Sequence, residues 1–238
     1  MSDHRPTGRV PSAFNVSFLI NAEDVTTLTL VRHGQQDIAD YGRGPVGDLI
    51  DPPLSKTGRR QAELLGKRFA DQQVDLVYSS NLRRAYDTGM EIARQHSLAP
   101  IVLEDLREVE LFRDIPPEHN AAEYIGHDLI LGVRERMISE RRWDVYPFSE
   151  SSFEFHKRTV NAIEAIAAGN RGKRIVIACH GGVINAYIGH TIGVPTDMFF
   201  FPAHTAVNVV LWGPHGGRAL QSLGDIHHLD AETALVTY

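Results

Sequence analysis

The sequence predicts an α/β fold in which helices cover both faces of a mostly parallel, mixed central sheet, giving three layers. Short apolar runs rich in β-branched residues alternate with helix-length segments along most of the chain, as in βαβ units. Two of these runs, 25–31 and 174–178, lead into a histidine followed by glycine, and ligands bind at the carboxyl ends of strands in such sheets. A long stretch in the middle breaks the alternation and is interpreted as an inserted helical cap.

The first half of the chain supplies the elements on which this prediction depends. Residues 1–24 are expected to form an N-terminal arm ahead of one domain over 25–238. The apolar run 16–20 would suit an edge strand or a subunit contact in a homodimer, and a loosely attached arm fits the composition equally well. After the first strand we expect a loop over 36–53, a helix over 56–71 with Ser55 as its N-cap, a strand over 74–78, a helix over 82–96 and a strand over 101–103.

The second half begins with the cap insertion, at about 110–150, which is expected to hold one or two helices as far as residue 143. Its arginines and acidic residues balance, so we interpret it as a solvated face. Ser151 and Glu154 match a capping box. The helix behind them is expected to carry an apolar stripe at Phe153, His156, Val160, Ile163 and Ala167. After this helix we expect a strand over 174–178, a helix over 182–192, a strand over 206–212 and a short strand over 219–223.

Composition and charge narrow the class of protein. The 238 residues carry a net charge of −6, which argues against nucleic acid or a membrane surface as the main partner. No apolar run approaches the ~20 residues that span a bilayer, and the polar start lacks the apolar core of a secretory signal. The patterns CxxC, HExxH and DxDxDG are absent, so we expect neither a metal site nor a cofactor. The single cysteine, Cys179, is expected to be a buried thiol and fits a cytoplasmic location, while His227 and His228 are expected to be solvated.

Cations, imidazoles and a carboxyl group are predicted to meet where the strands end. They come from Arg32-His33-Gly34, from the arginines at 83–84, from Leu106-Arg107-Glu108 and from His180-Gly181-Gly182. Arginine forks bind phosphate oxygens, and a helix that begins after His180 can offer backbone N–H groups to an anion. An imidazole nitrogen in such a cage can attack phosphorus, and a carboxyl group can donate a proton to the leaving oxygen and later activate water.

Five blocks of the sequence occur in an order that is shared with a known family. They are Leu-Val-Arg-His-Gly-Gln at 30–35, Asp-Pro-Pro-Leu-Ser-Lys-Thr-Gly-Arg-Arg-Gln-Ala at 51–62, Tyr-Ser-Ser-Asn-Leu-Arg-Arg-Ala-Tyr-Asp-Thr at 78–88, Leu-Arg-Glu at 106–108 and Val-Ile-Ala-Cys-His-Gly-Gly-Val at 176–183. From about residue 25 to 215 the chain resembles the histidine phosphatase (phosphoglycerate mutase-like) superfamily.

The resemblance implies a role for each matched residue. His33 would be the nucleophile that accepts the phosphoryl group, with Arg32 and Arg84 holding phosphate. His180 would contact the transferring phosphoryl group, and Glu108 would be the proton donor. Arg83 is the alternative to Arg84 and is expected to lie outside the pocket.

Two departures from the family pattern bear on the substrate. Many members carry asparagine six residues after the nucleophile as a further phosphate contact, and this chain has Ala39 there. Gln35 is the candidate that replaces it. Gly181 and His204 are further candidates for substrate contact, although a structural role suits His204 equally well. The Arg-His-Tyr-Gly continuation that follows Leu-Arg-Glu in the cofactor-dependent mutases is also absent.

The resemblance implies a metal-independent phosphatase that acts on a small phosphorylated substrate through a phosphohistidine intermediate on His33. A cofactor-dependent phosphoglycerate mutase is an alternative, which the missing continuation disfavours. A catalytically weak family member that acts as a binding module is another. Ala39 favours that reading mildly, whereas the presence of both histidines and the arginines opposes it.

Overall fold

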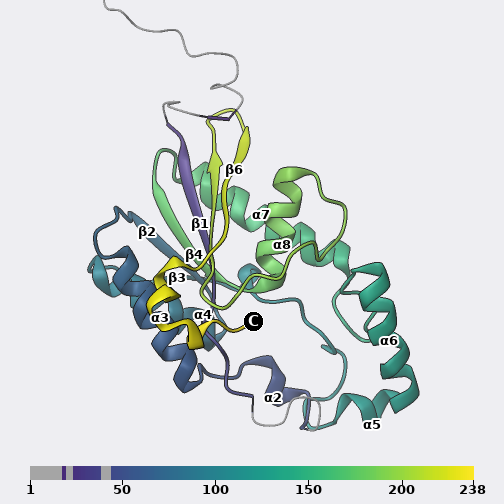
Figure 1. Cartoon of the computed structure of the whole chain (residues 1–238). Coiled ribbons are helices and arrows are strands. Elements are labelled where there is room, and N and C mark those ends of the chain that lie inside the picture. Colours follow the sequence, from purple (N-terminus) through teal and green to yellow (C-terminus); the bar gives the residue numbers. More distant parts are fainter. Residues whose placement is uncertain (1–17, 20–23, 39–43) are drawn as a thin grey trace, which may run out of the picture.

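The computed structural model describes residues 18–19, 24–38 and 44–238, whose strands form one six-stranded mixed sheet (Figure 1). The strand order is β3-β2-β4-β1-β5-β6, and β5 runs antiparallel to the other strands of the sheet. The predicted mostly parallel, mixed sheet is therefore confirmed. The strands are β1 (Thr26–Arg32), β2 (Leu76–Ser80), β3 (Ile101–Leu103), β4 (Arg174–Cys179), β5 (Val207–Trp212) and β6 (Arg218–Asp225).

Helices cover both faces of this sheet, as predicted. Figure 1 shows α3 (Lys56–Phe69) and α4 (Arg83–Gln95) on one side, and α7 (Ser152–Gly169) and α8 (Gly181–Ile192) on the other. Alternate residues of a strand point to opposite faces. In β4, Ile175 and Ile177 accordingly join the core beneath α7 and α8, whereas Val176 and Ala178 join the core beneath α3 and α4. Burial on both faces explains why this strand is apolar throughout.

The predicted helix starts are confirmed at two positions. The Ser55 side chain accepts a hydrogen bond from the Gly58 N–H, and Ser151 and Glu154 form both halves of a capping box. The stripe predicted for α7 is wrong at its first position, because Phe153 is 73% exposed while Phe155 is fully buried. The burial face of α7 therefore runs through Phe155 rather than through Phe153.

The stretch predicted as a loop contains a short helix, α2 (Gly47–Ile50), and Gln36 forms an isolated antiparallel bridge with Leu54. Backbone hydrogen bonds join the start of α2 to residues 117–119 of the segment predicted as the cap. That segment carries α5 (Ala121–Ile125) and α6 (His127–Glu140), which lie away from the sheet in Figure 1. Ala39 and most of the expected N-terminal arm, 1–24, lie outside the described residues.

The end of the chain folds back as a 3-10 segment, η2 (His227–Leu235). The expectation that both histidines here are solvated holds for His227, which is exposed, and is wrong for His228. His228 is partly buried, and its Nε2 lies 2.9 Å from Thr205 Oγ1. Among the described residues, no helix is both long and apolar enough to cross a membrane.

Candidate active site

The carboxyl ends of β1 and β4 place two imidazoles next to each other. The strands pair in parallel with Arg32 opposite Cys179, and the His33 N–H continues the ladder by donating to the Cys179 carbonyl at 3.0 Å. His33 and His180 follow directly, and the centres of their rings are 5.0 Å apart. His33 is 3% exposed and His180 is 0% exposed. The two His-Gly endings of the sequence therefore meet at one buried position.

The hydrogen bonds of His33 leave the lone pair of Nε2 as its reactive position. Nδ1 lies 2.7 Å from the Gly34 carbonyl oxygen, and because a carbonyl only accepts, Nδ1 carries the proton. Nε2 accepts a hydrogen bond from Arg84 Nε at 3.3 Å. Burial, together with the charge of Arg84, holds the pKa of His33 well below its usual value. The ring is therefore neutral near pH 7.

Of the two adjacent arginines, only Arg84 is directed at His33. Arg84 lies in the first turn of α4 and is 5% exposed, and its Nη1 donates to the Ile50 carbonyl of α2 at 3.1 Å. Arg83 is exposed, and its Nε pairs with Asp51 at 3.2 Å. Successive side chains of a helix point in different directions, so the Arg84 guanidinium lies inside the protein while that of Arg83 lies in solvent.

His180 is the N-cap of α8 and lies close to Arg32. Arg32 donates from Nη1 to the Pro202 carbonyl at 2.6 Å, and a Cβ built on Gly181 would lie 3.8 Å from Arg32 Nε. Within the described part of the chain, both ring nitrogens of His180 are buried without a hydrogen-bond partner. Burial and the charge of Arg84 hold the pKa of His180 well below its usual value. An anion at the start of α8 would supply the partner that the ring N–H lacks.

Glu108 directs its carboxylate at the start of α8. It follows the 3-10 turn η1 (Glu104–Leu106), and its Oε1 accepts from the Val109 N–H at 3.0 Å. Its Oε2 accepts from the Gly182 N–H at 3.1 Å. A Cβ on Gly182 would lie 2.2 Å from Glu108 Oε1, so the absence of a side chain there admits the carboxylate. A carboxyl group thus lies where the helix start would receive an anion.

His204 lies beside His33, whereas the Gln35 side chain is hydrogen-bonded at the start of α3. His204 is 4% exposed, and its ring centre lies 5.7 Å from that of His33. Its Nδ1 lies 2.9 Å from Thr237 Oγ1, and burial lowers the pKa of His204 to about 3. The Gln35 side chain instead accepts from Ser55 Oγ at 2.8 Å, at the N-cap of α3. The assignment of both residues to substrate contact stays a prediction.

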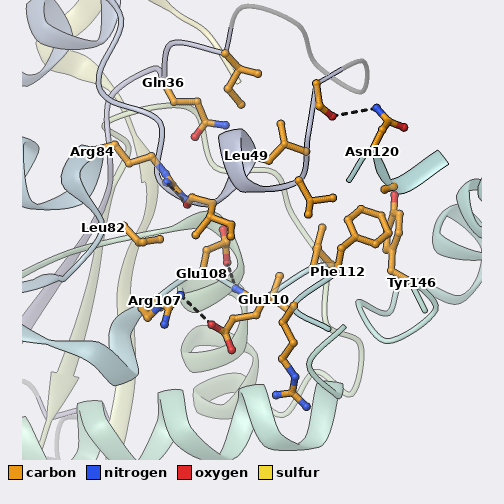
Figure 2. A pocket seen from close by; sticks show the side chains of 18 of the residues that line it. Gln36, Leu49, Leu82, Arg84, Arg107, Glu108, Glu110, Phe112, Asn120 and Tyr146 are labelled. Carbon is orange, nitrogen blue, oxygen red and sulfur yellow. Dashed lines mark hydrogen bonds and ion pairs between the residues drawn. The ribbon is translucent and has the colours of Figure 1, made fainter. Parts of the chain in front are cut away.

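A cavity of about 420 Å³ opens beside Arg84 and Glu108 (Figure 2). Residues of α2 and the chain before it form part of its wall, Gln36 among them, and the segment 107–113 forms another part. The site thus combines a neutral imidazole, guanidinium groups, a carboxylate and an adjoining space, which are the groups needed to transfer a phosphoryl group from an ester. Within residues 24–38 and 44–238, no group of three or more His, Cys, Asp or Glu side chains is placed to hold a metal ion.

A family model matches most of the chain. The model of the histidine phosphatase superfamily (branch 1) matches residues 28–225. The chain belongs to the histidine phosphatase superfamily. The predicted family and enzyme class, a phosphoric monoester hydrolase of the histidine phosphatase type, are therefore confirmed.

Relatives of this histidine phosphatase carry phosphatase names. The chain is 30% identical to the metal-independent phosphoserine phosphatase of Arabidopsis thaliana, over 68% of this chain and 67% of that protein. It is 28% identical to phosphoserine phosphatase 1 of Hydrogenobacter thermophilus, over 73% of this chain and 79% of that protein. Among solved structures, YhfR of Bacillus stearothermophilus matches with a TM-score of 0.71 and 25% identity, over 86% of this chain and 100% of that one.

Sequence reasoning missed the residues that hold Glu108 in this histidine phosphatase. Arg158 of α7 donates to the carbonyls of Asp105, Arg107 and Glu108 at 2.8, 2.9 and 3.0 Å. It also binds both carboxylate oxygens of Glu150 at 2.7 and 2.8 Å, and Glu150 is 3% exposed. Arg158 lies 50 positions from Glu108 in the chain, so no spacing rule links the two residues.

Proposed function

We propose that the chain is a metal-independent phosphatase that hydrolyses a phosphomonoester of a small molecule through a phosphohistidine on His33. The observation that carries this proposal is the state of the His33 ring. Its Nδ1 proton is held by the Gly34 carbonyl, and its Nε2 lone pair faces Arg84. A neutral imidazole with one oriented lone pair is a nucleophile, and the guanidinium beside it attracts the phosphate that the lone pair attacks.

In the first half-reaction the phosphoryl oxygens lie among Arg32, Arg84 and His180. The Nε2 lone pair of His33 forms the N–P bond while the bond from phosphorus to the ester oxygen breaks. The carboxyl group of Glu108 acts as the general acid and gives its proton to that oxygen, so an alcohol leaves rather than an alkoxide. The start of α8 and the guanidinium groups stabilise the charge on the equatorial oxygens.

In the second half-reaction water attacks the phosphoryl group on His33. The Glu108 carboxylate takes the proton from the water, and the electron pair of the N–P bond returns to Nε2. Inorganic phosphate leaves, and both residues regain their starting protonation states. Gly181 and the His204 ring are proposed to complete the surface around the phosphate.

Relatives act on phosphoserine by name, which supports a small phosphorylated substrate for this chain as well. We further propose a cytoplasmic location, with which the free, buried thiol of Cys179 is compatible. Residues 25–238 are proposed to act as one catalytic domain whose insertion, at about 110–150, covers the site.

The test of the mechanism is the fate of the phosphoryl group. Protein mixed with p-nitrophenyl phosphate and quenched in alkali is expected to carry an acid-labile, base-stable phosphoryl group on His33, located by peptide mapping. His33→Ala is expected to lose at least about a thousandfold in kcat. His215→Ala is the matched control, because His215 is exposed and lies outside the site. Turnover that persists in His33→Ala would reject the nucleophile.

A further inference from the structure

The cavity beside Arg84 and Glu108 is walled mainly by apolar side chains. Leu49 and Ile50 of α2 line one part of it, and Val109, Leu111 and Phe112 line another. Figure 2 shows Leu49 and Phe112 around the same space that Glu108 borders. Because Glu108 is the proposed proton donor to the leaving oxygen, the group attached to that oxygen would extend into this cavity.

An aromatic pair forms the wall that lies away from the catalytic groups. Phe112 and Tyr146 both line the cavity, and their rings meet edge to face with centres 5.4 Å apart. Phe112 adopts a left-handed backbone conformation with φ of 59°, which is rare for a bulky residue. The Ser149 hydroxyl accepts from the Phe112 N–H at 2.9 Å and holds it there. The protein thus keeps a strained backbone that presents an aromatic ring to the cavity.

Of the three arginines that line the cavity, Arg107 and Arg113 form ion pairs with acidic side chains, whereas Arg84 faces His33. Arg107 pairs with Glu104 at 3.2 Å and with Glu110 at 2.8 Å, and Glu110 itself lines the cavity. Arg113 pairs with Asp114 and with Glu154, each at 3.6 Å. Because the phosphate would occupy Arg84, a carboxylate on the leaving group would meet the two paired arginines and the acidic oxygens of Glu108 and Glu110. Desolvating an unpaired charge is costly, so the wall disfavours an acidic leaving group.

We infer that the substrate is the phosphate ester of an uncharged alcohol whose apolar, aromatic body fills this cavity. The inference rests on the proposed phosphatase function and specifies its substrate class. A volume of about 420 Å³ suits an organic group of metabolite size. The chemistry differs from that of phosphoserine, which carries an ammonium and a carboxylate on its leaving alcohol.

The first experiment compares three primary alkyl esters, 2-phenylethyl phosphate, ethyl phosphate and O-phospho-L-serine, as substrates of the full chain. All three break a bond to a primary alkoxide, so they differ mainly in the group that the cavity would hold. We expect kcat/KM for 2-phenylethyl phosphate to exceed the other two by about 10- to 100-fold. Equal or faster hydrolysis of O-phospho-L-serine would overturn the inference and leave the phosphatase function intact. No hydrolysis of any ester, p-nitrophenyl phosphate included, would overturn both.

The second experiment locates the preference in the cavity wall. Phe112→Ala and, independently, Leu49→Asn are expected to lower the ratio of kcat/KM for 2-phenylethyl phosphate over ethyl phosphate by about tenfold. Phe153→Ala is the matched control, because Phe153 is exposed on α7 and does not line the cavity, and it is expected to leave the ratio unchanged. The ratio compares two substrates of one protein sample, so partial unfolding cancels. An unchanged ratio in both cavity variants would overturn the inference.

Discussion

At the scale of single residues, Glu108 carries out both of the proposed proton transfers. Its carboxylate accepts hydrogen bonds from the Val109 and Gly182 N–H groups and borders the cavity that would hold the leaving alcohol. Glu108→Gln keeps a side chain of the same shape but removes the transferable proton. We expect kcat for an alkyl phosphate to fall by about 10²–10⁴-fold. The loss for p-nitrophenyl phosphate should be much smaller, because its phenolate leaves without protonation.

Neighbouring acids serve as comparisons for that variant. Glu104 lies in the preceding turn η1 with its side chain 75% exposed, so Glu104→Gln is expected to leave both rates unchanged. Equal losses on the two substrates in Glu108→Gln would assign Glu108 to folding or binding. A loss found only in Glu110→Gln would move the proton donor to that residue, which also lines the cavity.

At the scale of elements, the start of α3 packs backbone to backbone on the turn after His33. A Cβ on Gly58 would lie 2.0 Å from the Gln35 carbonyl oxygen, and a Cβ on Gly34 would lie 2.4 Å from the Gly58 carbonyl oxygen. Neither backbone can move far, since both belong to hydrogen-bonded segments. We expect Gly58→Ala to lower the free energy of unfolding by about 2 kcal/mol or more, measured by urea denaturation, and to lower kcat by displacing the His33 turn.

Gly132→Ala is the matched control for that substitution. Gly132 lies inside α6, and a Cβ there would meet nothing within 4 Å. Alanine in a helix interior is expected to be neutral or to stabilise the protein by up to about 1 kcal/mol. Full stability and activity in Gly58→Ala would show that α3 does not position the turn after His33.

At the scale of the whole molecule, buried neutral histidines make stability depend on pH. Burial holds the pKa of His33 and His180 well below the usual value, and lowers that of His204 to about 3 and that of His228 to about 4. Below pH ~6.5 the unfolded chain takes up protons that the folded protein does not, so stability is constant above that pH and falls on acidification. Each such histidine adds up to about 1.4 kcal/mol per pH unit to the slope.

Urea denaturation at pH 7.5, 6.5 and 5.5 measures this slope. His228→Asn is expected to reduce it while leaving His33, His180 and His204 in place, and His227→Asn, which replaces an exposed ring, is expected to leave it unchanged. Stability that is flat or rises between pH 6.5 and 5.5 would contradict the buried, neutral state of these rings.

Several elements were predictable because their causes are local in the sequence. The capping box at Ser151 and the N-cap at Ser55 follow from residues within one helical turn. The two His-Gly endings lie at strand ends, and parallel pairing of those strands is enough to bring His33 and His180 together. The helix α2 was not predicted, since four residues among turn formers carry no periodic signal. The Ile50 carbonyl of this helix nevertheless accepts a hydrogen bond from the Arg84 guanidinium.

The sequence by itself therefore determined the family and the sheet, because these depend on short motifs and on strand and helix periodicity. The tertiary structure alone decided the surroundings of the candidate site residues. Arg158 reaches Glu108 across 50 positions, and Thr237 reaches His204 across 33. The cavity is lined by α2, by the segment 107–113 and by Tyr146, and no fixed spacing in the sequence relates these three parts to one another. Such contacts depend on how separate elements pack, and packing leaves no local pattern in the chain.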